Sequence, residues 1–173
     1  ALPWQWSSVG TPWSGREARL KGDALEVHTG DGRIGTDTDE DDFEFIYQEL
    51  HGDGEIVAHV KELAPEGSAT TAGVMIREGP LGLRRKQVFA GYTAGNFIVL
   101  QRGNEMVVPP VAGPSTGWVK LARHGPRITI SSSADGRKFR QMATMRTDLP
   151  PTACLGIAVA GANVPVQWWT VPG

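Results

Sequence analysis

The chain has 173 residues, of which 40 % are hydrophobic and 21 % are charged, and its formal net charge is −2. This length and this composition are typical of a globular protein, and they predict a single domain over residues 1–173. No apolar run approaches the roughly 18 residues that a membrane-spanning helix needs, so we expect no membrane span.

Acidic and basic residues are distributed unevenly along the chain. Residues up to Ile76 include 15 acidic and 5 basic side chains, whereas residues from Arg77 onward include 4 acidic and 12 basic ones. If the two halves interleave in one domain, these charges mix in space. The asymmetry therefore does not predict a surface for nucleic acid, and we expect no nucleic-acid partner.

Two features concern the cellular compartment. Ala1 to Trp4 have neither the basic nor the apolar region of a signal peptide, as is true both of a processed secreted chain and of a cytosolic one. Cys154 is the single cysteine, so the fold cannot depend on an internal disulfide. Its apolar neighbours predict a buried, unreactive thiol.

Short apolar segments bounded by glycine, proline and polar residues predict strands along most of the chain, and no segment has a sustained helical period. The predicted strands are Ala24–His28, Phe43–Gln48, Glu55–Glu62, Ala72–Arg77, Gln87–Thr93, Asn96–Gln101, Glu105–Val108, Trp118–Arg123, Arg127–Ser133, Phe139–Thr144, Cys154–Ala160 and Val166–Val171. Many short strands with turn residues between them favour a sandwich or a barrel.

The segments Ile56–Val60 and Gly73–Arg77 receive a more specific prediction. Turn residues bound each of them, which is typical of adjacent antiparallel strands. Neither segment alternates cleanly between apolar and polar residues, so we expect both faces of each strand to be covered. Thr93–Asn96 and Ala134–Arg137 are predicted to be tight hairpin turns.

The chain resembles a known group of domains through short segments that run almost from end to end. These are Trp6 with Val9-Gly10 and Gly15; Asp42-Phe43 and Tyr47-Gln48; Leu50 with Gly52 to Ile56; Ala72 to Glu78; Trp118 to Leu121 with Arg123 and Gly125; Ser133 with Asp135-Gly136 and Phe139; and Leu155 to Val159. They resemble the concanavalin A-like domains of the group that includes the yeast regulation-of-enolase protein. The resemblance implies an all-β fold, a laminin-G-like or jelly-roll sandwich of two antiparallel sheets.

The same resemblance implies a range of functions. Sugar binding and sugar hydrolysis both occur in that superfamily, and many members are parts of secreted bacterial proteins. We therefore expect an extracellular or secreted protein, with a cytoplasmic location as the alternative. The expected function is a non-catalytic, lectin-like module that binds a glycan or another small ligand. The alternatives are a glycoside hydrolase and a protein-interaction domain, and the oligomeric state stays open.

The acidic run from Asp37 to Asp42 could hold a cation. Asp37, Asp39 and Asp42 are hard oxygen donors of the kind that Ca²⁺ prefers, although the spacing does not match an EF-hand. The alternative is a solvated loop. We expect no required cofactor, and calcium is the one ion that the sequence suggests.

Residues for catalysis are not evident. The carboxylates do not reproduce the spacing of sandwich-fold glucanases, no nucleophile or nucleotide motif occurs, and the four histidines form no ligand pair. His59 lies within a predicted strand, where a packed side chain is the favoured interpretation.

Six tryptophans provide possible platforms for a sugar ring. Trp118 is expected in or near the core, and of the adjacent pair Trp168 and Trp169 one is expected in the core. We predict that Arg77, Tyr92, Arg102 and Trp169 lie near a ligand-binding groove on a concave sheet or its rim. For Arg77 the alternative is a structural ion pair, with Glu55 as one possible partner.

Overall fold

The computed structural model of the protein describes residues 4–9, 17–21, 24–28, 43–61, 71–79, 86–93, 95–101, 105–106, 110–112, 116–160 and 163–172. For residues 17–21, 24–28, 105–106 and 163–172 the backbone pairing is described. All regular secondary structure in these residues is β-strand, as the absence of a helical period predicts. No helix long and apolar enough to cross a membrane occurs in this part of the chain.

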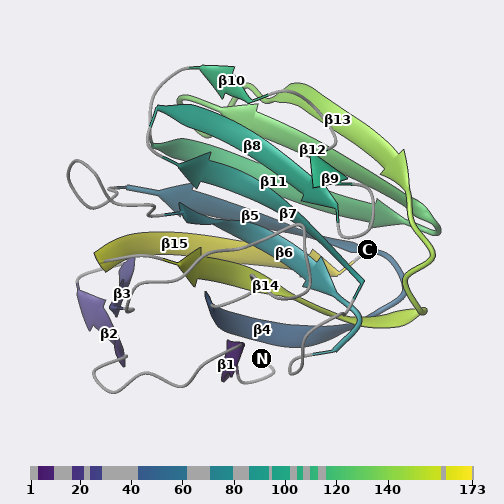
Figure 1. The fold of residues 1–173 in the computed structure, drawn as a ribbon, viewed down its shortest axis with the longest axis horizontal. Helices are drawn as coiled ribbons and strands as arrows, with labels where there is room; N and C mark the ends of the chain where they lie inside the picture. Colours follow the sequence, from purple (N-terminus) through teal and green to yellow (C-terminus); the bar gives the residue numbers. More distant parts are fainter. Residues whose placement is uncertain are drawn as a thin grey trace.

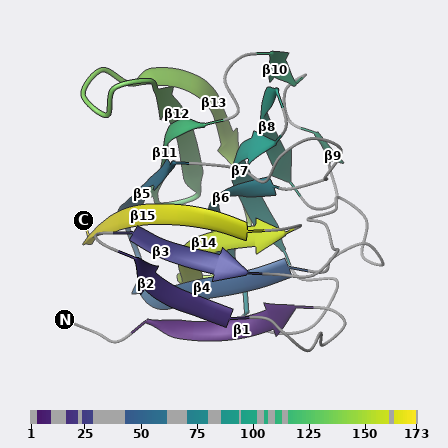
Figure 2. The ribbon, with the colours of Figure 1, turned by 90° about the vertical axis from the view of Figure 1, so that its left-hand side faces the viewer.

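The described strands form two antiparallel sheets, which Figures 1 and 2 show as two layers. Sheet A has the order β1 (Gln5–Val9), β4 (Phe43–His51), β14 (Thr152–Ala160), β6 (Thr71–Arg77), β7 (Gln87–Thr93), β8 (Asn96–Gln101) and β10 (Val111–Ala112), and β9 (Glu105–Met106) also pairs with β8. Sheet B has the order β13 (Arg140–Arg146), β12 (Arg127–Ser133), β11 (Gly117–His124), β5 (Gly54–Val60), β15 (Asn163–Pro172), β3 (Ala24–His28) and β2 (Glu17–Lys21). The predicted two-sheet sandwich is confirmed.

Most predicted strands occur with boundaries that shift by a few residues. The structure adds β1, β2 and β10, which sequence reasoning missed because each is short or flanked by turn residues. The Thr93–Asn96 turn joins β7 to β8, with Gly95 at a positive φ of 77°. The connection after Ser133 is longer than the tight turn that was predicted, because β13 begins only at Arg140.

The strands β5 and β6 are not neighbours, so the prediction that they pair is wrong. β5 lies between β11 and β15 in sheet B, whereas β6 lies between β14 and β7 in sheet A. The connection over residues 61–70 is longer than the two to five residues usual for a hairpin, and it passes from one sheet to the other. The two strands also differ in burial. Buried and half-buried residues alternate along β5, but every residue of β6 is buried.

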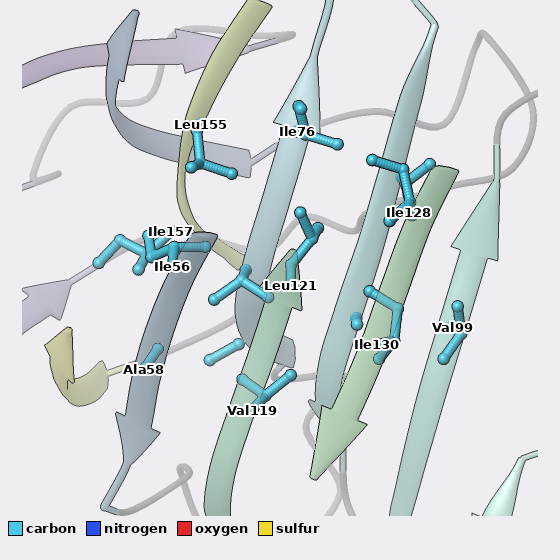
Figure 3. Close-up of a cluster of buried hydrophobic side chains, with 14 of the residues drawn as sticks. Ile56, Ala58, Ile76, Val99, Val119, Leu121, Ile128, Ile130, Leu155 and Ile157 are labelled. Atoms are coloured by element: carbon cyan, nitrogen blue, oxygen red, sulfur yellow. The ribbon is translucent and has the colours of Figure 1, made fainter. Parts of the chain in front are cut away.

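The main core lies between the sheets, and Figure 3 shows part of it. Side chains from β5, β11 and β12 of sheet B meet side chains from β6, β8 and β14 of sheet A: Ile56, Ala58, Val119, Leu121, Ile128 and Ile130 on one side, and Ile76, Val99, Leu155 and Ile157 on the other. Their spacing of two along each strand places them all on the inward face.

A second apolar cluster, the outer cluster, covers the opposite face of sheet A. Its buried members are Phe43, Phe45, Tyr47, Met75, Phe89, Leu100, Cys154, Ala158 and Ala160. Phe45, Met75 and Phe89 are 0 % exposed. Sheet A is therefore packed on both faces, and this part of its outer face is not open to solvent. The burial predicted for Cys154 is confirmed.

Two paired glycines lie in the middle of sheet A. Gly73 of β6 is directly opposite Gly91 of β7. A Cβ atom at Gly73 would overlap the Ala90 carbonyl oxygen and lie 2.6 Å from the Gly91 Cα. Only glycine fits where two backbones approach this closely.

Candidate functional site

A pocket of about 260 Å³ lies where the edges of the two sheets meet. Strands β7, β8 and β10 of sheet A and β12 and β13 of sheet B contribute to it. β8, β10, β12 and β13 gather at the same end of the molecule in both Figure 1 and Figure 2. The volume is slightly below the range of about 300–1,000 Å³ that is usual for ligand pockets, so a small ligand or the end of a longer one would fit.

The apolar part of the pocket comes from both sheets. Its residues are Phe97, Val111, Ala112, Ala134 and Met142. Phe97 is buried and its ring stands edge-on to that of Tyr92, with 5.2 Å between the ring centroids. Val111, in contrast, is 39 % exposed at the mouth of the pocket. The site therefore combines a fixed aromatic floor with an apolar rim.

The polar part of the pocket is rich in hydroxyl and cationic groups. Its residues are Tyr92, Thr116, Ser132, Ser133, Lys138 and Arg140. Ser132 is directly opposite Arg140 in the β12–β13 pairing, just beyond an irregularity in the register. Lys138 and Arg140 are both exposed at the rim. Of these residues, Thr116, Ser132, Lys138 and Arg140 can together donate several hydrogen bonds to one ligand.

The turn that carries Lys138 is held by side chains from its own beginning. The Ser133 hydroxyl accepts the backbone N–H groups of Asp135 and Gly136 and donates to the Asp135 carboxylate. That carboxylate also accepts the N–H groups of Arg137 and Lys138. These bonds keep the pKa of Asp135 below its usual value, and the bonds from the backbone N–H groups of Lys138 and Arg137 contribute most. Asp135 therefore stays ionised and organises the turn.

The turn also rests on Trp118 from the outer face of sheet B. A Cβ atom added to Gly136 would lie 2.6 Å from the indole Cε2 atom, so the turn backbone packs directly against the ring. The opposite residue on β5 is His59, whose ring stacks on Trp118 with centroids 4.2 Å apart and planes 8° apart. The packed side chain predicted for His59 is confirmed. Trp118 itself, which was expected in or near the core, is half-buried on the outer face of sheet B.

Tyr92 joins the two sheets beneath the pocket. Its hydroxyl donates a hydrogen bond of 2.7 Å to the backbone carbonyl of Trp118. Burial raises the pKa of Tyr92 to about 12, so the phenol remains protonated and remains a donor at neutral pH. Tyr92 therefore supports the pocket in addition to lining it.

The structure places two of the predicted ligand-binding residues, Tyr92 and Arg77, on different faces of sheet A. Tyr92 faces the space between the sheets, whereas Arg77 lies on the outer side of sheet A, next to the outer cluster. Trp169 belongs to β15 of sheet B, where its backbone is opposite Val57. Arg102 lies outside the described residues. Of the two whose side chains are described, Tyr92 lines the pocket and Arg77 does not.

Arg77 is fully buried and makes structural contacts. Its Nε donates to the side-chain oxygen of Gln87 at 2.7 Å, and its Nη1 donates to the carbonyl of Gly79 at 2.9 Å. The guanidinium also lies over the Phe43 ring, 5.7 Å from the centroid. Glu55, the carboxylate considered from the sequence, belongs to β5 of the opposite sheet.

The predicted metal ligands Asp37, Asp39 and Asp42 lie outside the described residues. Within the described part of the chain, no group of three or more histidine, cysteine, aspartate or glutamate side chains could hold a metal ion.

Sequence reasoning missed most of the pocket. The Asp135-Gly136 turn was recognised, but Lys138 and Arg140 just after it received no role. Ser132 and Ser133 lie in a predicted strand, and neither they nor Met142 were predicted to bind a ligand. The sequence did contain a signal for this site: two cationic residues, Lys138 and Arg140, closely follow the Asp135-Gly136 turn.

Comparisons with solved structures place this architecture in a class. A functionally unknown protein from Saccharomyces cerevisiae matches with a TM-score of 0.80 at 13 % identity, over 98 % of this chain and 96 % of the yeast chain. The carbohydrate-binding module CBM66 from Bacillus subtilis matches with a TM-score of 0.61 at 13 % identity, over 94 % and 91 % of the two chains. The exoplasmic/lumenal domain of VIP36, in a form with Ca²⁺ and Man3GlcNAc bound, matches with a TM-score of 0.58 at 12 % identity, over 97 % and 82 %.

These similarities define the fold as a concanavalin A-like β-sandwich. The low identities limit the conclusion to the fold. No family model and no curated protein matches the sequence.

Proposed function

We propose that the protein is a carbohydrate-binding module and that the pocket between β8, β10, β12 and β13 holds the sugar. The observation that carries this proposal is the composition of the pocket. It combines the buried Phe97 ring and apolar rim residues with hydroxyl, ammonium and guanidinium donors. A sugar ring presents C–H groups and hydroxyls together, so it needs both kinds of contact in one small cavity.

The site is also ready to bind without rearrangement. Ser133, Asp135 and Trp118 hold the turn in place, and Tyr92 connects the backbone of Trp118 to sheet A. A ligand then does not have to order the loop that it contacts, which reduces the entropic cost of binding. The fold is shared with the carbohydrate-binding module CBM66 and with the VIP36 domain in its Man3GlcNAc-bound form, which gives this proposal further support.

Binding is favoured over hydrolysis by the pocket residues themselves. A glycosidase needs two carboxyl groups about 5–10 Å apart across the scissile bond. The described residues that line the pocket include no aspartate, glutamate or histidine. The proposed role is therefore recognition, with hydrolysis of the bound glycan as the outcome that would contradict it.

Three further expectations belong to this proposal. Membership of the group that includes the yeast regulation-of-enolase protein is supported by the quoted sequence segments and by the match to a yeast structure.

An extracellular location would suit a module that binds glycans. Calcium at Asp37, Asp39 and Asp42 is supported by the density of carboxylates there, and a thermal shift in millimolar Ca²⁺ that a chelator reverses would test it.

A glycan array followed by calorimetry on the hits tests the main proposal. The informative variant is Ala112→Trp, because Ala112 is exposed at the pocket and an indole there would occupy the mouth. Thr144→Trp is the matched control, since Thr144 is exposed on β13 but does not line the pocket.

We expect Ala112→Trp to lower glycan affinity at least tenfold, and Thr144→Trp to leave it unchanged. Both variants should keep the parent unfolding temperature, because neither position is buried. Equal binding by all three proteins would place the site elsewhere. Release of reducing sugar from a bound glycan would replace binding with hydrolysis as the function.

A further inference from the structure

The charges around the pocket are one-sided. Lys138 and Arg140 place two cationic groups at its rim, and none of its described lining residues is acidic. Within the described part of the chain, no hydrogen bond or ion pair joins the Lys138 ammonium or the Arg140 guanidinium to another side chain. Both groups are therefore available to a ligand.

Three of the acidic side chains from Arg77 onward are engaged by partners other than the Lys138 ammonium and the Arg140 guanidinium. Asp135 accepts hydrogen bonds from the Ser133 hydroxyl and from two backbone N–H groups of its own turn. Asp148 binds Lys86 at 2.7 Å, and Glu78 accepts the Lys86 backbone N–H. These three are among only four acidic residues from Arg77 onward, and for the fourth, Glu105, the backbone pairing is described. Two of the twelve basic residues from Arg77 onward, Lys138 and Arg140, thus line the pocket with charged groups that pair with none of these three carboxylates.

We propose that the ligand of the pocket is an acidic glycan, with a carboxylate or a sulfate ester held between Lys138 and Arg140. This inference rests on the proposed function and identifies its class of ligand. A guanidinium can donate two parallel hydrogen bonds to either anion, and an ammonium can add a third contact from a second direction. The hydroxyls of Thr116 and Ser132 then lie in the same pocket for the hydroxyls of the sugar ring.

The test compares uronate-containing, sulfated and neutral oligosaccharides of equal length by calorimetry. Arg140→Gln and Lys138→Gln remove one charge each and keep a polar side chain of similar length. Arg127→Gln is the matched control, because Arg127 is exposed on β12 and does not line the pocket. It corrects for the loss of one positive charge from the whole molecule.

We expect about a tenfold loss of affinity for the acidic glycan in each pocket variant, and less than a twofold loss in Arg127→Gln. Binding to the parent should also weaken as the salt concentration rises. Comparing the affinities for uronate-containing and sulfated oligosaccharides then identifies which anionic group the pocket holds. Binding of either class supports the inference.

Two results would overturn it. Neutral glycans that bind as tightly as acidic ones, and that Ala112→Trp blocks but Arg140→Gln does not, would refute the acidic ligand and leave the carbohydrate site standing. Equal losses of affinity in Arg140→Gln and Arg127→Gln would mean that the net positive charge of this surface attracts the glycan and that the pocket holds no specific anion site. If no glycan of any class binds, the proposed function fails and this inference fails with it.

Discussion

The outer faces of the two sheets are built differently. On sheet A, Phe45, Met75 and Phe89 are completely buried, so this sheet is packed on both of its faces. On sheet B, Val57, Trp118 and Lys120 are half-buried, and the residues between them along each strand form the core. A sheet packed on both faces has continuous apolar strands, whereas a sheet packed on one face has alternating ones. The difference predicts where the protein tolerates change.

The largest expected effect comes from closing the space between β6 and β7. Gly73→Val would place its side chain against the Ala90 carbonyl and the Gly91 backbone, which cannot move without breaking the sheet. We expect a loss of about 3 kcal/mol or more in the free energy of unfolding, measured with urea. Ala122→Val adds two methyl groups to the half-buried face of sheet B and should change the stability by less than about 0.5 kcal/mol. Similar losses of stability in the two variants would contradict the difference in packing between sheet A and sheet B.

The next largest effect is expected when one apolar side chain is truncated on the outer face of each sheet. Phe45→Ala removes a fully buried ring that stacks on Tyr47 with centroids 5.0 Å apart, and it should cost about 3–5 kcal/mol. Val57→Ala removes two methyl groups from the half-buried face of sheet B and should cost about 1 kcal/mol or less. If Phe45→Ala proves as mild as Val57→Ala, then the outer cluster does not stabilise the fold.

A smaller effect concerns the pH dependence of stability. Burial, with a contribution from Glu49 that Arg77 opposes, raises the pKa of Cys154 from 9.0 to about 11. The folded state therefore holds the thiol proton more tightly than the unfolded state. The resulting contribution to the free energy of unfolding is fully present below pH 9, and it is lost as the pH rises towards 11.

We expect on the order of 2 kcal/mol of stability to disappear over that interval, measured by urea unfolding at pH 8.5 and 10.5. Cys154→Ala should remove most of this dependence and retain the part that Tyr92 contributes between its ordinary pKa of 10.0 and about 12. An unchanged slope in Cys154→Ala would mean that the thiol is not protected by the outer cluster.

The smallest effect tests the aromatic stack on sheet B. His59→Ala removes the ring that stacks on Trp118, and we expect a loss of about 1 kcal/mol. His124→Ala, at an exposed position on β11, serves as the control and should have almost no effect. Because Trp118 supports the pocket turn, His59→Ala should also weaken glycan binding slightly. A loss as large as that of Phe45→Ala would show that sheet B has a buried outer face after all.

The strands illustrate how far sequence patterns reach. The apolar run from Ala72 to Arg77 indicated a strand covered on both faces, and β6 is buried throughout. The run from Ile56 to Val60 was read in the same way, but β5 is covered on one face only, since Val57 and His59 are half-buried. A half-exposed valine and a buried one look alike in a sequence, because apolar side chains occur on both surfaces.

The pocket illustrates where such patterns stop. Tyr92 was predicted to lie near a binding groove, and it does line the pocket, but Arg77 on the neighbouring strand β6 lies on the other face of sheet A. The pocket joins residues from Tyr92 to Met142 that belong to two different sheets. Their proximity depends on which edges of the sheets meet, and spacing along one strand contains no information about that.

The sequence by itself determined the all-β character, the approximate positions of most strands and the burial of Cys154. These properties follow from local rules, since side chains alternate along a strand and glycine and proline interrupt it. Only the tertiary structure decided that β5 and β6 belong to opposite sheets, that sheet A is packed on both faces, and that Lys138 and Arg140 border one cavity. These properties depend on contacts between residues far apart in the chain, whose free energies are set by the packed sheets together.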